Sequence, residues 1–239
     1  MNLSEIMKLL METLLMVFIS TCITYLLGLP LGLILSITSK KGIAPNKVVN
    51  LILSTIVNIL RSIPCLIVVV LTIPFVRGLF GVGTGKWYTI IVPLIITSVG
   101  FVARMIEQSL REVDYGKIEA IKSLGATNMQ IVTKVLIPEA RASLIGGIAV
   151  VMVSIIGYTS FAYNIGAGGI IAEIWQFYSK HTGNYLNEPV FWILIVIIII
   201  RFTFGCQYAL YPLTGQNKSK KRVIRCLGYA AKQQAAAAS

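Results

Sequence analysis

Continuous apolar runs of about 20 residues limit most strongly what this chain can fold into. A helix rises about 1.5 Å per residue, so a run of this length crosses the hydrocarbon core of a bilayer. The runs do not alternate as the strands of a membrane β-barrel do. We therefore predict an all-α, polytopic membrane protein with about five transmembrane helices. They are expected at 12–38, 48–76, 88–110, 143–164 and 189–211, with a short additional helix at 168–178.

Composition supports a membrane protein and changes the meaning of the basic charge. Of the 239 residues, 56% are hydrophobic and only 13% are charged, whereas soluble domains carry about 25% charged residues. The net charge of +12 would suggest nucleic acid as a partner of a soluble protein. Here the lysines and arginines lie mainly in loops and in the tail, where they set topology. We expect no nucleic-acid partner.

The basic residues also predict the orientation in the membrane. They gather in the loop after the first span, between the third and fourth spans, and in the tail, and five spans place all three segments on one side. The sequence therefore predicts the N-terminus outside and the C-terminus in the cytoplasm. We expect a permease domain at 1–215 and a basic cytoplasmic tail at 216–239. The low-complexity end of that tail is either disordered or an added sequence.

The segment 114–141 is polar and amphipathic, and it lies between two apolar spans. Asp114 can cap a short helix, and Gly125 supplies the left-handed residue that commonly ends one. Thr127 and Gln130 have the spacing of a capping box and predict a second short helix.

The end of this second helix is expected at Pro138, because proline disfavours a helical residue before it. Met129, Val132 and Leu136 are expected on one face. A compact knob with exposed apolar residues usually has a partner, although a solvated connector is the alternative.

Catalytic chemistry is not indicated. The four cysteines have neither metal-type nor C-x-x-C spacing, and no cluster of His, Cys, Asp or Glu resembles a metal or catalytic centre. The string GVGTGKW at 81–87 is not a phosphate loop, because Phe80 replaces the first glycine and Trp87 the final Ser or Thr. We expect no catalytic residue, no metal and no cofactor.

The string EAIKSLGATNMQIVTKVLIP at 119–138 resembles the coupling loop of permeases of binding-protein-dependent ATP-binding-cassette importers. That motif reads Glu-Ala-Ala, three residues, Gly, nine residues, Ile, any residue, Leu, Pro. Its spacing is matched in full, with Ile121, Val135 and Ile137 as apolar replacements. In the family this loop docks in a cleft on the ATPase. The resemblance carries ATPase coupling to Glu119, Ala120, Gly125, Ala126 and Pro138.

Four further segments, 58–77, 90–113, 125–140 and 157–170, look like the methionine importer permease. The resemblance implies the type I importer permease fold and a homodimer in the bacterial plasma (inner) membrane, in contact with lipid. Its implied partners are two cassette ATPase subunits and an extracytoplasmic substrate-binding protein or lipoprotein. The implied substrate is D- or L-methionine or a close analogue. ATP hydrolysis belongs to the partner, so the chain is not an enzyme.

Charged residues within the apolar segments are candidate pathway or structural residues. Arg61 and Pro64 indicate either a bend near the pathway or a helix end at the membrane surface. Arg104 and Glu107 are three residues apart and can pair on one helix face. That pair would either orient the coupling loop or be only an interfacial ion pair.

Two further candidates come from the resemblance, which suggests that Tyr158 and Ser160 line the pathway. Arg201 falls near the middle of the fifth predicted span, where packing is the favoured role. The alternatives to an importer of methionine are a related cassette importer for another small solute, an amino-acid secondary transporter not driven by ATP, and a membrane scaffold that recruits a cytoplasmic partner. No acidic residue lies deep in a predicted span, which weakens the secondary-transporter interpretation.

Overall fold

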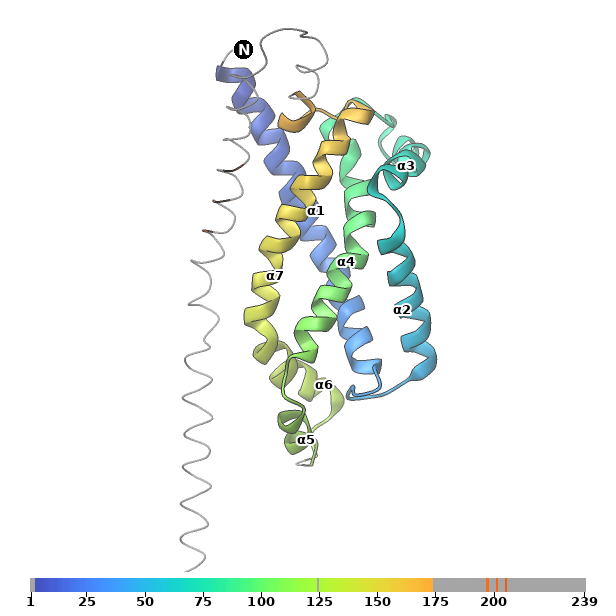
Figure 1. Cartoon of the computed structure of the whole chain (residues 1–239), viewed down its shortest axis with the longest axis vertical. Helices are drawn as coiled ribbons and strands as arrows, with labels where there is room; N and C mark the ends of the chain where they lie inside the picture. The colour runs from blue at the N-terminus through green and yellow to red at the C-terminus, as the bar shows by residue number, and fades with distance from the viewer. Residues whose placement is uncertain (1–2, 124, 174–196, 198–200, 202–204, 206–239) are drawn as a thin grey trace, which may run out of the picture.

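The computed structural model describes residues 3–123 and 125–173, together with positions 197, 201 and 205. Three long helices form its centre: α1 (Leu3–Thr38), α4 (Ile91–Arg111) and α7 (Ile137–Tyr158). They run along the long axis of the molecule, with α2 (Lys47–Ser62) beside them (Figure 1). The described part is built from helices and turns, as the apolar runs predict.

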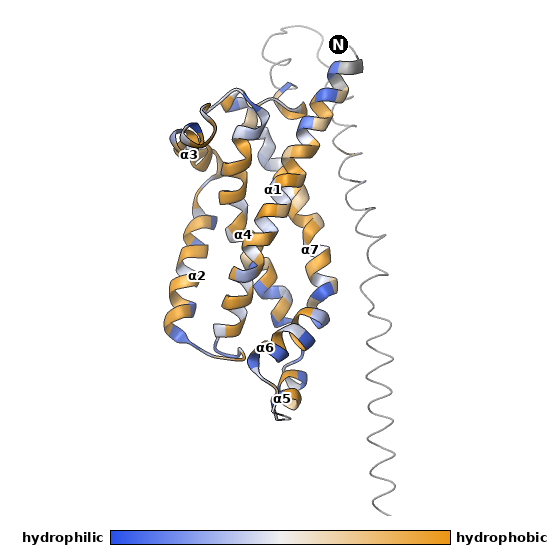
Figure 2. Cartoon of the chain, turned by 180° about the vertical axis from the view of Figure 1, so that it is seen from behind, coloured by the Kyte–Doolittle hydropathy of each residue, from blue (hydrophilic) through white to orange (hydrophobic). Residues whose placement is uncertain are grey.

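Three stretches are long and apolar enough to cross a membrane: Met7–Thr38, Trp87–Arg111 and Asn128–Ile165. They correspond to the first, third and fourth predicted spans, which are thereby confirmed. Hydrophobic residues cover these helices along their length, and hydrophilic residues gather toward the helix ends and in the lower loop (Figure 2). The fifth predicted span lies outside the described residues, apart from the helical positions 197, 201 and 205.

The second predicted span is not one continuous helix. It divides into α2 and α3 (Cys65–Phe80), whose axes are bent by 100°. Pro64 explains the break, because proline lacks the amide proton that would continue α2 and disfavours helical geometry at Ile63. Ile63 is extended, with φ −80° and ψ 121°. The sequence leaves a bend or a helix end open at Pro64, and the structure has a sharp corner at which α2 ends and α3 begins.

Short elements lie at both ends of the long helices (Figure 1). At the lower end, the chain between α4 and α7 forms α5 (Tyr115–Ser123), α6 (Asn128–Ile131) and the π-helical turn η2 (Val132–Leu136). At the upper end lie the 3-10 turns η1 (Trp87–Ile90) and η3 (Thr159–Ile165). The predicted helix at 168–178 begins at Ile170, and its part beyond residue 173 lies outside the described residues.

The central helices pack closely because small residues face large ones. Gly28 and Gly32 of α1 lie against Val102 and Ala103 of α4, so close that a Cβ on Gly32 would be 2.7 Å from the Ala103 carbonyl oxygen. The Tyr25 hydroxyl of α1 donates a hydrogen bond of 2.8 Å to the carbonyl of Leu144 in α7. These contacts hold α4 and α7 on α1, and both ends of the α4–α7 connection start from that core.

Candidate functional site: the loop between α4 and α7

The first helix of the loop, α5, begins and ends with the predicted turn chemistry. Asp114 Oδ1 accepts a hydrogen bond of 3.0 Å from the Gly116 amide at its start. At its end Gly125 is left-handed, with φ +82°. The Gly125 amide donates to the Lys122 carbonyl at 3.0 Å and the Ala126 amide to the Ile121 carbonyl at 3.4 Å. This pair of bonds is the Schellman arrangement, which fixes the direction in which the chain leaves α5.

The second helix, α6, begins with the predicted capping box. The Gln130 amide donates to Thr127 Oγ1 at 3.4 Å, and the Thr127 amide donates to Gln130 Oε1 at 3.0 Å. Two of the otherwise unpaired amides at the helix start are thereby satisfied. The predicted bend between two short helices is confirmed.

The prediction of a break at Pro138 is wrong. The helix passes through η2 directly into α7, and Pro138 lies in the first turn of α7. A proline in a regular helix would lack one hydrogen bond and would clash with the carbonyl four residues earlier. The π turn places the wider spacing just before the proline, and the Ile137 amide bonds to the Val132 carbonyl five residues back. A π turn thus lets the chain pass through Pro138 without a break.

One side of the loop is anchored in the protein core. Ile118, Ile131, Val132 and Leu136 are buried and belong to the same hydrophobic cluster as the long helices. Ile131 and Leu136 are five residues apart, which is the hydrogen-bond spacing of a π turn. The expectation that Met129, Val132 and Leu136 share one exposed face is therefore wrong for Val132 and Leu136, which are buried, whereas Met129 is 71% exposed.

The other side of the loop is exposed. Glu119 and Ala120 on α5, Gly125 at the turn and Pro138 at the start of α7 are all exposed, and Ala126 is half-buried against the core. Glu119 and Ala120 lie on α5, which ends at the Gly125 turn and forms the lower end of the described helices (Figure 1), and Pro138 lies in the first turn of α7. Met129 is exposed on the same loop, and the buried residues of the loop fix the backbone that carries these positions.

Two long-range contacts of α5, an ion pair and a hydrogen bond, were not predicted from the sequence. The Lys117 ammonium pairs with the Glu139 carboxylate across the loop. Lys122 Nζ donates to the carbonyl of Ile43, in the connection between α1 and α2, at 3.4 Å. Opposite charges flank the loop in the sequence, but a separation of 22 residues gives no geometric signal until the turns are known.

The predicted Arg104–Glu107 pair exists and is part of a larger cluster. Arg104 Nη1 lies 2.7 Å from Glu107 Oε2, and Arg111 Nη2 lies 2.7 Å from Glu107 Oε1. Arg104 also donates to Asn58 Oδ1 at 2.9 Å, to the Ser54 carbonyl at 3.2 Å and to the Ser54 hydroxyl. The cluster therefore joins α2 to α4 through Arg104, about two helical turns before α4 ends at Arg111.

The remaining candidates lie away from the loop. Arg61 is exposed near the α2–α3 corner, close to Gly100 of α4, and Pro64 forms that corner. Tyr158 and Ser160 lie at the far end of α7, whose 22 residues span about 33 Å at 1.5 Å per residue. The structure thus separates the loop at one end of α7 from Tyr158 and Ser160 at the other.

The fold and site define a helical, multi-pass membrane protein with a structured loop between two of its spanning helices. Residues 28–211 match the family model described as "Binding-protein-dependent transport system inner membrane component". The chain belongs to this family.

Curated relatives cover most of the chain. A probable D-methionine transport system permease protein, MetI, of Pasteurella multocida is 38% identical over 190 residues, which cover 80% of this chain and 87% of the relative. The methionine import system permease protein MetP of Bacillus subtilis is 42% identical over 168 residues, covering 70% and 75% of the two chains.

Solved structures agree with the described fold. A chain of the MetNI methionine ABC transporter in an inward-facing conformation has a TM-score of 0.82 and 32% identity, covering 90% of this chain and 99% of its own. A chain of an amino acid ABC transporter solved with histidines has a TM-score of 0.70 at 22% identity, and this likeness concerns the fold alone.

Proposed function

We propose that the chain is the permease subunit of an ATP-driven importer for methionine, taking D- or L-methionine or close analogues. Two copies would form the translocation pathway, and ATP would be hydrolysed by separate cassette ATPase subunits. The loop between α4 and α7 carries this proposal, because it is an exposed, turn-fixed surface that is rigidly joined to the spanning helices.

The substrate is inferred from the relatives. Proteins named as methionine permeases match this chain over most of their length, and a structure of the MetNI methionine transporter has the same fold. The sequence resemblance at 58–77 and 157–170 points the same way.

Coupling would work through the loop as a mechanical part. Closure of two ATPase subunits around ATP would move the two docked loops together. We assign docking to Glu119, Ala120, Gly125, Ala126 and Pro138. Because buried side chains and the Lys117–Glu139 pair fix the loop to α4 and α7, its movement would be passed to the spanning helices. The permease would then alternate between inward-facing and outward-facing states.

The proposed orientation rests on the distribution of basic residues and agrees with this role. The loop would face the cytoplasm, with the N-terminus outside, residues 1–215 as the permease domain and 216–239 as a cytoplasmic tail. An extracytoplasmic binding protein would deliver substrate at the opposite end, where Tyr158 and Ser160 lie. Arg61, Pro64, Arg104 and Glu107 would be pathway or structural residues.

The test is a substitution at the turn. Valine at Gly125 would be strained, since a left-handed residue with a side chain costs roughly 1–2 kcal/mol. A cost of this size reduces the population of the docking shape by about 5- to 30-fold. We expect Gly125→Val to lower ATP-driven uptake of labelled methionine by about tenfold in proteoliposomes with the partner ATPase, with unchanged amounts in the membrane.

Two variants serve as controls. Gly125→Asn should keep most of the uptake, because asparagine tolerates the left-handed conformation. Gly78→Val places the same side chain in open space on α3 and should leave uptake unchanged. Normal uptake in Gly125→Val would remove the docking role. If the unaltered complex took up another solute but not methionine, the substrate assignment would be wrong, while the assignment as an importer permease would stand.

A further inference from the structure

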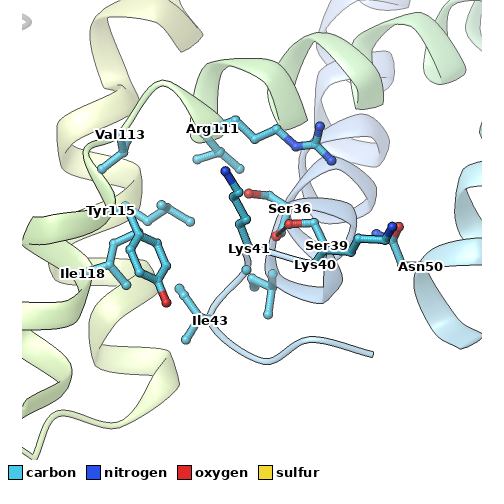
Figure 3. A pocket seen from close by; sticks show the side chains of 14 residues that line it. Ser36, Ser39, Lys40, Lys41, Ile43, Asn50, Arg111, Val113, Tyr115 and Ile118 are labelled. Carbon is cyan, nitrogen blue, oxygen red and sulfur yellow. Dashed lines mark hydrogen bonds between the residues drawn. The ribbon is translucent and has the colours of Figure 1, made fainter. Parts of the chain in front are cut away.

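A cavity of about 470 Å³ lies at the base of the candidate docking loop. It is open to the surface and is lined mainly by the end of α1, the connection 39–46, the end of α4 and the start of α5 (Figure 3). Its size falls within the usual range of small-molecule sites. Because α1 ends and α2 begins beside it, the cavity lies where the apolar spans give way to polar residues. Nothing in the proposed transport function uses it.

The wall formed by the connection 39–46 is fixed in shape. Gly42 lies so close to the end of α1 that a Cβ there would be 2.1 Å from the Ile37 carbonyl oxygen. The Ala44 amide donates to that carbonyl at 3.2 Å, and Asn50 Nδ2 donates to the Leu35 carbonyl at 2.9 Å. Ile43 is 5% exposed and belongs to the main core. A cavity held in this way is present before any ligand arrives.

The charges that line the cavity are positive. Lys40 and Lys41 line it and have no ion-pair partner among the described residues. Arg111 also lines it, with its charge shared with Glu107. No carboxylate belongs to the described lining. In Figure 3, Lys41 extends from the connection between the side chains of Ser36 and Tyr115.

We propose that this cavity binds a phosphate group, supplied by the headgroup of an anionic phospholipid in the adjoining leaflet. Two ammonium groups offer six N–H donors and two positive charges, which suit the charge and several acceptor oxygens of a phosphate. Basic pockets at the membrane surface between helices are where such headgroups bind. A soluble phosphate offers the same chemistry, and the experiment separates the two sources.

The test is lipid binding by the full chain, purified in an uncharged detergent and observed by native mass spectrometry. Phosphatidylglycerol and the zwitterionic phosphatidylcholine are titrated separately. For Lys40→Gln/Lys41→Gln we expect phosphatidylglycerol binding to fall by about 10- to 30-fold, since each lysine near an anionic lipid contributes several-fold. The matched control, Lys47→Gln/Lys134→Gln, removes two exposed charges outside the cavity lining and should stay within about twofold of the unaltered protein.

Each outcome decides the proposal. Selective loss in the cavity variant supports the site, and then added inorganic phosphate distinguishes the sources: displacement of the lipid assigns the cavity to soluble phosphate, and retention assigns it to the headgroup. Equal loss in both double variants, or equal affinity for both lipids, would show unspecific attraction and overturn the proposal. The readout is binding, so it stands or fails separately from the transport function.

Discussion

At the scale of single residues, Arg104 is the most connected side chain in the described chain. It contacts Glu107 on its own helix and Ser54 and Asn58 on α2, while Glu107 is 3% exposed. Breaking a buried pair from one side is costly, because the remaining charge stays away from water. The second arginine on Glu107, Arg111, reduces that cost.

We therefore expect Arg104→Met to lower the free energy of unfolding by about 1–3 kcal/mol. For a chain of this length each kcal/mol lowers Tm by roughly 2–4 °C, so the loss is measurable by thermal unfolding in detergent. Arg77→Met, at the exposed end of α3, is the control. The double variant Arg104→Met/Glu107→Leu should be more stable than Arg104→Met alone, because it leaves no unbalanced carboxylate. An unchanged Tm in Arg104→Met would exclude a structural role for the cluster.

This cluster shows which residues a sequence can pair. Arg104 and Glu107 are three apart on one helix, and Glu107 and Arg111 are four apart, so helical spacing alone brings them together. Ser54 and Asn58 are far away in sequence, and their contact with Arg104 depends on how α2 packs on α4. The contact between Lys117 and Glu139 likewise depends on the folded loop and not on their spacing in the sequence.

At the scale of elements, the close packing of α1 on α4 depends on Gly32. A Cβ there would lie 2.7 Å from both the Ala103 carbonyl oxygen and the Ile106 Cβ. The Ala103 carbonyl and the Ile106 Cβ cannot be relieved by a side-chain rotation, so a side chain at Gly32 would force α1 and α4 apart. We expect Gly32→Val to destabilise the protein by about 1–3 kcal/mol, as overpacking does.

The measurement is again thermal unfolding in detergent, compared with Gly78→Val. That control places the same residue in a helix with nothing within 4 Å, so it reports only the helix propensity of valine. A Tm for Gly32→Val equal to that of the control would mean that α1 and α4 are not held at this distance.

The residues that form turns and caps made the short helices predictable, whereas the structure at the two prolines could not be predicted from the sequence. The Gly125 turn and the Thr127–Gln130 capping box depend on neighbouring residues alone, so the sequence contains all their determinants. A proline, by contrast, only forbids regular helix and does not say what replaces it. Pro64 gives a 100° corner where a bend or a helix end was expected, and Pro138 follows a π turn where a break was expected.

At the scale of the whole molecule, the length of the apolar runs predicts the membrane spans, and the distribution of basic residues predicts their orientation. Apolar length located three continuous spans and the bent helix pair α2–α3 among the described residues. The candidate docking surface also needed the fold, because only packing decides that Ile131 is buried while Met129 is exposed. Orientation is the part that still rests on the charges alone.

Labelling of single cysteines on intact cells tests that orientation. With the four native cysteines replaced by serine, Asn164→Cys lies exposed after α7, and Asn128→Cys lies exposed in the loop between α4 and α7. The two sites are separated by the length of α7, about 33 Å, which exceeds the hydrocarbon thickness of about 30 Å. A membrane-impermeant maleimide should label Asn164→Cys directly and Asn128→Cys only after permeabilisation. The reverse pattern would place the loop outside, where no cytoplasmic ATPase could reach it, and the proposed coupling would fail with it.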